Sequence, residues 1–151
     1  MTIESDLAVL DANVLVYAYY EESEHFEAAR LLLAKAQDEA AQLCVTPRSL
    51  AEFYATVTNP RRVTEPKSTD VALGAIAEIL ALPGMLLLPT PVDVVSRWTE
   101  LLRRHPVTGP DFFDLQLVAT MLGNGVRRLY TFNVRDFTGF DEIEALIPSA
   151  S

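Results

Sequence analysis

The sequence predicts an α/β domain in three layers, with a mainly parallel central sheet flanked by helices on both faces. Three observations lead to this prediction. Short apolar runs, typical of buried strands, alternate along the chain with segments of helical periodicity. Half of the residues are apolar and 22% are charged, a balance typical of a folded core. The length of 151 residues suits one such domain, which we expect to span residues 1–151.

The first predicted strand and helix lie close to the N-terminus. Residues 7–10 form an apolar run that stops at Asp11, the pattern of a buried strand with an acid at its carboxyl end. Apolar residues then recur at helical spacing from Phe26, and Ser23 before them is a candidate cap. This spacing predicts a helix that reaches about Ala41.

The rest of the chain repeats the alternation of strand and helix. Further strands are expected over residues 43–45, 85–88 and 128–132, with a weaker candidate at 143–147. Helices are expected between Thr46 and Asn59 and over residues 68–82, 92–104 and 112–122. Their predicted caps are Thr46 with Pro47 behind it, Ser68, and Asp111 for the last helix.

Five polar residues occupy positions that parallel connectivity brings to one edge of the sheet. Asp11 follows the first strand, Glu52 lies in the first turns of the helix after the second strand, and Asp114 opens the helix before the fourth. Asn133 and Asp136 follow the fourth strand. Because ligands of such sheets bind at the carboxyl edge, these side chains are candidates for a shared site.

Each candidate also has a purely structural interpretation. Asp11, Asn133 and Asp136 could be turn residues, a common role for Asp and Asn. Asp114 could interact with the helix dipole in the first turn. Glu52 points away from the apolar face of its helix, as solvated glutamates do, although small neighbouring residues would let a substrate or metal approach.

A cluster of carboxylates has a chemical consequence. Acids within about 4–6 Å of each other repel unless a cation neutralises them. Oxygen ligands without a His or Cys partner suit Mg²⁺ or Mn²⁺ better than zinc, and magnesium favours substrate phosphate oxygens. The residues therefore support the hypothesis of a metal-dependent nuclease site.

The charge balance limits how such a protein would meet nucleic acid. Twelve Lys and Arg against 21 Asp and Glu give a net charge of −9. This sign excludes binding through a broad basic surface, so contact should be local or mediated by metal. Arg61 and Arg62, with Arg48 nearby, form a small basic island that could touch phosphates, although solvated arginines are the commoner explanation.

Two observations bear on the compartment. The longest aliphatic run, residues 85–88, falls far short of the roughly 20 residues that span a bilayer, so no membrane association is expected. Cys44 is the single cysteine, which excludes an intramolecular disulfide framework and a thiolate zinc cluster. A reducing cytoplasm is the expected location.

Four segments, in order, carry a family resemblance. They are Leu-Asp-Ala-Asn-Val-Leu at 10–15, the run from Ser-Leu-Ala-Glu-Phe-Tyr to Thr-Asn-Pro-Arg at 49–61, Gly-Pro-Asp-Phe-Phe-Asp at 109–114, and Tyr-Thr-Phe-Asn-Val-Arg-Asp-Phe at 130–137. Together they resemble the motifs of the PIN-domain ribonucleases, particularly the VapC toxins of bacterial toxin–antitoxin pairs. The similarity runs from about residue 7 to residue 148.

The resemblance implies a PIN-like fold and a Mg²⁺- or Mn²⁺-dependent endoribonuclease that acts on RNA. By motif position it implies Asp11 and Asp114 as principal metal ligands and Glu52 as the acid completing the site. It also implies a small cognate antitoxin, for which a charge of −9 favours a basic segment, and a homodimer. The chain departs from the family pattern at Asn133, where many relatives place an acid, and in the bulky Phe112–Phe113 pair.

Two other functions remain open from the sequence. One is a non-catalytic PIN-like module that binds RNA or protein, which Asn133 favours. The other is a phosphatase of the haloacid dehalogenase type, with Asp11 as nucleophile. That chemistry normally needs a second Asp two residues later, where this chain has Asn13.

Overall fold

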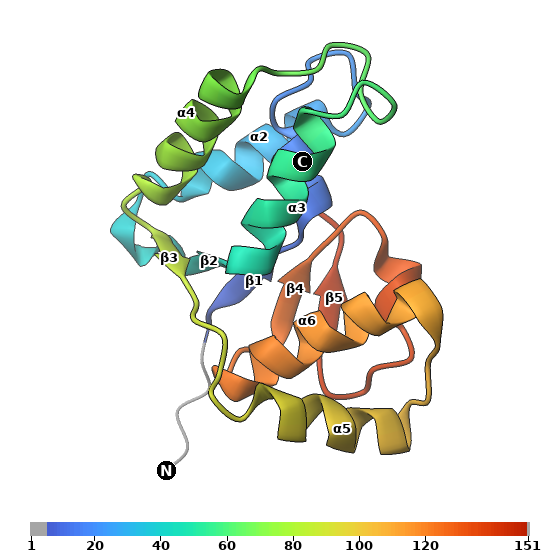
Figure 1. The fold of residues 1–151 in the computed structure, drawn as a ribbon. Coiled ribbons are helices and arrows are strands. Elements are labelled where there is room, and N and C mark those ends of the chain that lie inside the picture. Colours follow the sequence, from blue (N-terminus) through green and yellow to red (C-terminus); the bar gives the residue numbers. More distant parts are fainter. Residues whose placement is uncertain (1–5, 151) are drawn as a thin grey trace.

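The computed structural model describes residues 6–150, which contain a five-stranded sheet (Figure 1). Every neighbouring pair of strands is parallel, as predicted, and the weak candidate strand near the C-terminus is present. Ala8 in the central strand pairs with Leu43 on one side and Arg128 on the other. The spatial order is β3 (Met85–Leu87), β2 (Leu43–Val45), β1 (Ala8–Leu10), β4 (Arg128–Tyr130) and β5 (Glu144–Leu146).

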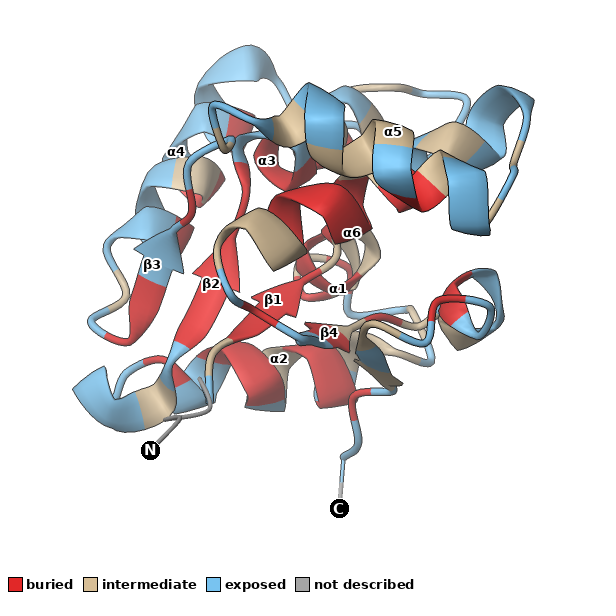
Figure 2. Cartoon of the chain, turned by 90° about the horizontal axis from the view of Figure 1, so that it is seen from below, coloured by how far each residue is buried: buried red, intermediate tan, exposed pale blue. Residues whose placement is uncertain are grey.

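Helices cover both faces of the sheet, which confirms the three-layer α/β prediction. Side chains alternate along β1, so Ala8 and Leu10 enter the core formed with α1–α4, and Val9 enters the core formed with α5 and α6. Figure 2 shows β1 and β2 buried between these layers. The helices are α1 (Ala12–Tyr17), α2 (Phe26–Lys35), α3 (Pro47–Val57), α4 (Thr69–Leu80), α5 (Val94–Arg104) and α6 (Phe112–Gly123).

The sheet order creates a crevice at its carboxyl edge. The chain passes from β1 to β2 in one direction along the sheet, whereas β4 lies on the opposite side of β1. In open parallel sheets, such a reversal leaves a crevice outside the carboxyl ends of the two strands, where ligands bind. Asp11 directly follows β1 at this point. No helix within residues 6–150 has the length and apolar character needed to cross a membrane.

Two of the predicted helix caps are confirmed. The Thr46 hydroxyl accepts the Ser49 N–H at 3.1 Å, with Pro47 as the first helical residue of α3. The Ser68 hydroxyl accepts the Val71 N–H at 3.2 Å at the start of α4. Each hydroxyl satisfies a backbone donor that the first helical turn leaves without a partner.

The predicted Ser23 cap is wrong, and Asp111 occupies the N-cap position of α6 without a side-chain capping hydrogen bond. The Ser23 hydroxyl accepts the N–H of His25, inside the preceding turn, and α2 begins only at Phe26. Asp111 already has helical backbone angles because the short segment η2 (Gly109–Asp111) runs directly into α6, and its side chain makes no capping hydrogen bond.

The structure also corrects the elements near the N-terminus. The helix expected to reach Ala41 ends at Lys35, and the separate segment η1 (Glu39–Ala41) follows, capped by Asp38. The sequence analysis did not predict α1, because six largely apolar residues are too few to show helical periodicity. Asp11 is therefore the N-cap of a helix rather than a turn residue.

Candidate active site

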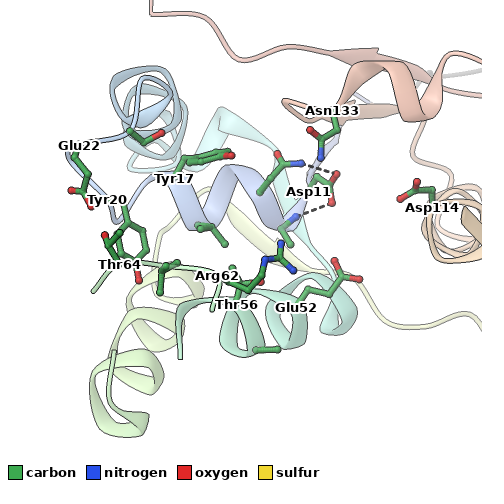
Figure 3. Close-up of a pocket in the computed structure, with 16 residues that line it drawn as sticks. Asp11, Tyr17, Tyr20, Glu22, Glu52, Thr56, Arg62, Thr64, Asp114 and Asn133 are labelled. Carbon is green, nitrogen blue, oxygen red and sulfur yellow. Dashed lines mark hydrogen bonds between the residues drawn. The ribbon is translucent and has the colours of Figure 1, made fainter. Parts of the chain in front are cut away.

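A cavity of about 590 Å³ opens at the carboxyl edge of the sheet (Figure 3). Four of the five residues predicted to form the site line it: Asp11, Glu52, Asp114 and Asn133. They come from the end of β1, from α3, from the first turn of α6, and from the turn after β4. The fifth, Asp136, is exposed in the short segment η3 (Val134–Phe137) and does not line the cavity.

Three hydrogen-bond donors hold the carboxylate of Asp11. Its Oδ1 accepts the N–H of Ala12 at 2.8 Å. Its Oδ2 accepts the Thr131 hydroxyl at 2.9 Å and the side-chain amide of Asn13 at 3.3 Å. The carboxylate therefore has a fixed orientation at the meeting point of β1 and β4.

The environment of Asp11 nevertheless disfavours its charge. Burial is the main cause, and it raises the pKa of Asp11 above its ordinary value. The hydrogen bonds from Thr131 and Ala12 lower the pKa, whereas the charges of Glu52 and Asp136 raise it further. The negative charge is thus held in place by donors without being neutralised by a cationic side chain.

The environment of Asp114 raises the pKa of this residue more strongly still. Burial, and then the charges of Asp136, Asp11, Asp111 and Glu52, raise the pKa of Asp114 to about 6. Its carboxylate accepts no hydrogen bond from any other residue of the described chain. Four acids around a half-buried carboxylate form an arrangement that an added cation would stabilise.

Glu52 forms an ion pair with an arginine. Its Oε1 accepts a hydrogen bond from Nε of Arg48 at 2.7 Å, one helical turn earlier in α3. The guanidinium of Arg48 also lies 4.3 Å from the centre of the Phe113 ring, in α6. Arg48 therefore contacts both α3 and α6, the helices on either side of the acidic end. Glu52 is engaged in an ion pair rather than simply solvated.

Asn133 takes the place where an acid was expected from the family pattern. Its backbone N–H donates to the Thr131 hydroxyl at 3.0 Å, which fixes the turn after β4. Its side-chain amide has no hydrogen-bond partner among residues 6–150, so it is available to a ligand in the cavity. A neutral amide can donate to a phosphate oxygen or offer an oxygen to a cation.

The sequence analysis missed two residues that position the site. Thr131 is completely buried and links Asp11 to Asn133. Asn13 donates to Asp11 and to Thr131, and its Oδ1 accepts the Phe132 N–H at 3.1 Å. The available signal was the Asp-x-Asn spacing at a helix start together with a Thr directly after a strand.

The acids fit a hard divalent cation that keeps most of its own water. No three acidic, histidine or cysteine side chains within residues 6–150 form a ready-made metal cage. Mg²⁺ is commonly held by only one or two carboxylates together with water and substrate phosphate. Asp11 and Asp114 are the two acids whose raised pKa values and shared cavity suit that role.

Comparison with known proteins agrees with this architecture. The family model of the PIN domain matches residues 8–144. VapC ribonuclease Mb2897 of Mycobacterium bovis is 31% identical over 115 residues, which cover 76% of this chain and 78% of that protein.

Two solved structures share the fold. VapBC2 from Rickettsia felis, bound to a DNA fragment from its promoter, superposes with a TM-score of 0.66 at 15% identity, covering 95% of this chain and 99% of that chain. VapC20 from Mycobacterium tuberculosis, a toxin that cleaves the sarcin-ricin loop, gives a TM-score of 0.64 at 17% identity, over 88% and 95% of the two chains. The crevice beside β1, the acids that line it and these matches together assign the chain to the PIN-domain family, within the VapC ribonuclease toxins.

Proposed function

We propose that this chain is a divalent-cation-dependent endoribonuclease that acts in the cytoplasm as the toxin of a toxin–antitoxin pair. The observation that carries the proposal is the presence of Asp11, Glu52 and Asp114, from three separate parts of the chain, in one cavity. RNA as the substrate is supported by the family, since the Mycobacterium bovis relative is named a ribonuclease and VapC20 is described as a toxin that cleaves the sarcin-ricin loop.

In this proposal, Asp11 and Asp114 hold Mg²⁺ or Mn²⁺. When bound, such an ion offsets the negative charge of a phosphodiester and lowers the pKa of water. The raised pKa values of both carboxylates support this assignment, because a cation between them would remove the repulsion that raises those values. Thr131 and Asn13 keep Asp11 pointing into the cavity.

Glu52 and Asn133 supply the remaining polar groups. Glu52 accepts the proton of the attacking water, once its ion pair with Arg48 loosens to let the carboxylate turn toward the phosphate. Asn133 donates its side-chain amide to a phosphate oxygen. The water oxygen then bonds to phosphorus as the bond to the leaving nucleoside oxygen breaks. Asp136, outside the lining, adds negative charge near Asp11 and Asp114 and touches no substrate.

The proposed partners follow from the family and from charge. A structural neighbour from Klebsiella pneumoniae is a toxin–antitoxin complex, and we infer that a cognate antitoxin likewise covers this chain. A net charge of −9 favours a basic antitoxin segment. We also expect the chain to form a homodimer, as inferred from the family resemblance.

A cleavage assay tests the proposal. Purified protein is incubated with end-labelled RNA in Mg²⁺, in Mn²⁺ and in EDTA, beside Asp11→Asn and the control Asp93→Asn. Asp93 lies before α5 in an exposed ion pair with Arg97. We expect the wild type and Asp93→Asn to cleave only with a divalent ion, and Asp11→Asn to lose at least 100-fold in rate (order of magnitude).

Other outcomes would decide for the alternatives. RNA binding without cleavage under any metal would favour a non-catalytic module. A phosphoenzyme trapped on Asp11 would favour a phosphatase, but the position of Asn13 disfavours that chemistry. Its amide is fully engaged with Asp11, Thr131 and the Phe132 backbone, so no acid stands there to protonate a leaving group.

A further inference from the structure

Arg62 is a charged residue of the cavity for which the described chain supplies no partner. It follows α3, in the loop that leads to α4, and lines the cavity together with Asp11 and Glu52. Figure 3 shows its guanidinium reaching into the cavity beside Thr56 and Glu52. Within residues 6–150 this guanidinium makes no hydrogen bond, ion pair or ring contact.

The absence of a partner is informative because carboxylates line the same cavity. Glu52 is paired with Arg48 instead, at 2.7 Å. Arg62 therefore does not pair with the acids of the cavity. Its positive charge stays unpaired there among residues 6–150, in a protein of net charge −9. A guanidinium presents a fixed fork of N–H donors that matches two oxygens of a phosphate. A phosphate group is therefore the kind of ligand that would pair with Arg62.

The cavity is also larger than a metal ion and one phosphate require. Its volume of about 590 Å³ lies within the range of roughly 300–1,000 Å³ typical of sites for small organic ligands. Beyond the acidic end, its lining includes Tyr17 and Tyr20. The Tyr17 ring packs edge-on against His25 at 4.9 Å and Phe132 at 5.5 Å, while its hydroxyl has no hydrogen-bond partner in the described chain.

These features divide the cavity into two parts. The acidic end around Asp11 and Asp114 suits the phosphate that is cleaved, and the remaining lining, to which Arg62 and Tyr17 contribute, has the size and chemistry for a neighbouring nucleotide. An aromatic ring and a cation are the groups with which proteins hold single-stranded RNA, by stacking on a base and by charge on the backbone.

We propose that Arg62 binds the RNA phosphate adjacent to the one that is cleaved, and that the nucleotide between them lies against Tyr17. The inference rests on the proposed ribonuclease function and adds a subsite to it. Arg62 positions the strand in this account, since it binds a neighbouring phosphate and not the one that is cleaved. Losing it should weaken binding of RNA more than it slows the chemical step.

The chain offers a matched control in the neighbouring residue. Arg61 is also an exposed arginine without a side-chain partner in residues 6–150, but it does not line the cavity. Arg62→Ala, Arg62→Lys and Arg61→Ala therefore remove or alter the same kind of charge at adjacent positions. Because the Arg62 guanidinium makes no hydrogen bond, ion pair or ring contact within residues 6–150, Arg62→Ala should melt within about 1 °C of the wild type.

Steady-state cleavage of a short single-stranded RNA tests the proposal. We expect Arg62→Ala to raise KM about tenfold with kcat changed less than about threefold, Arg62→Lys to be intermediate, and Arg61→Ala to match the wild type. A second readout is fluorescence anisotropy of labelled RNA bound by the Asp11→Asn protein. Adding Arg62→Ala should reduce the slope of log affinity against log salt by about 0.7.

The outcomes separate the subsite from the proposed function. If the wild type cleaves RNA and Arg62→Ala behaves like Arg61→Ala, the subsite is rejected and the ribonuclease function stands. A fall in kcat without a rise in KM also rejects it, because Arg62 would then act at the cleaved phosphate. A wild type that never cleaves RNA rejects the proposed function itself, whatever the binding data show.

Discussion

The hydroxyl of Thr131 donates a hydrogen bond of 2.9 Å to Oδ2 of Asp11, joining two residues that are 120 positions apart. The same hydroxyl accepts the side-chain amide of Asn13 at 3.1 Å and the N–H of Asn133 at 3.0 Å. The hydrogen and both lone pairs of the Thr131 hydroxyl are thus all engaged in hydrogen bonds, and the side chain is completely buried. The ends of β1 and β4 are joined through this one hydroxyl, which fixes the direction of the Asp11 carboxylate.

Replacing that hydroxyl should impair catalysis. Thr131→Val keeps the shape of the side chain but removes the donor to Asp11. It also leaves the Asn133 N–H without its acceptor and the Asn13 amide with Asp11 as its one remaining acceptor. Groups that orient metal ligands typically contribute about 10–100-fold to activity or metal affinity, and we expect a loss in that range. Thr131→Ser, which retains the hydroxyl, should keep most of the activity. Equal rates for the two variants in the RNA assay would contradict this role.

Asp114→Asn should stabilise the protein in the absence of metal. Burial and four neighbouring acids raise the pKa of Asp114 to about 6, so its negative charge opposes folding at pH 8. Removing the charge should raise the free energy of unfolding in EDTA by about 1 kcal/mol, a value reduced by solvent screening of a half-buried group. Added Mn²⁺ should then raise the melting temperature of the wild type and not of the variant. A variant less stable than the wild type in EDTA would contradict the charge argument.

Arg48 should limit how tightly the site binds a cation. Its ion pair with Glu52 at 2.7 Å brings a positive charge close to the acidic end. In Arg48→Ala that charge is gone, so Mn²⁺ affinity measured by calorimetry should rise a few-fold (order of magnitude). The exposed pair contributes little to stability, so the melting temperature should change little. Arg103→Ala removes a comparable exposed pair with Glu100 on α5 and is the control. A weaker affinity in Arg48→Ala would mean that Arg48 holds Glu52 in a productive position.

Glu142 should make stability depend on pH. It joins the end of α5 to the chain before β5, with Oε2 at 2.8 Å from Arg104 and Oε1 at 3.1 Å from His105. Burial opposes its ionisation, but hydrogen bonds from its own backbone N–H and from His105, with the charges of His105 and Arg104, lower the pKa of Glu142. A lowered pKa means that the carboxylate stabilises the fold above the ordinary pKa of glutamate. This stabilisation is lost as the pH falls through the lowered value.

Glu142→Gln should therefore lower the free energy of unfolding by about 1 kcal/mol at pH 7. In urea denaturation, the difference from the wild type should shrink as the pH falls below the ordinary pKa of glutamate and disappear once the wild-type carboxyl is protonated as well. Glu144→Gln is the control, because Glu144 lies in an exposed pair with Arg128 at the longer distance of 3.9 Å. A difference between wild type and Glu142→Gln that stays constant from pH 7 down to pH 2 would contradict the ionic role.

The parts of the fold that follow from the sequence are those with a strong local pattern. The strands show as short apolar runs and α3–α6 as periodic segments with stop signals, and connectivity alone then predicts the parallel sheet. Helix α1 carries no such pattern, because its six residues, of which Ala12, Val14 and Leu15 are buried, are too few to show helical periodicity. The predicted helix extends past the observed end of α2 because residues 36–41 have good helical propensity. In the structure, Gln42 takes a left-handed conformation, with φ of 55°, just before β2.

The sequence predicts the candidate site through one rule, that ligands of open parallel sheets bind at the carboxyl ends of the strands. That rule placed Asp11, Glu52, Asp114 and Asn133 on one edge, where the structure has them. It could not distinguish Asp136, three residues beyond Asn133, because a turn of 3₁₀ helix decides which side chain enters the cavity. Arg62 resembles Arg61 in sequence, and only the path of the chain after α3 separates their environments.

Crystallography with manganese tests the central claim most directly. Crystals soaked in Mn²⁺ should give an anomalous peak at the acidic end of the cavity, about 2.1 Å from carboxylate oxygens of both Asp11 and Asp114. The peak should be absent from crystals of Asp114→Asn that have been soaked in the same way. Manganese bound elsewhere, or a cavity that stays free of it at millimolar concentrations while the wild type cleaves RNA, would contradict the account.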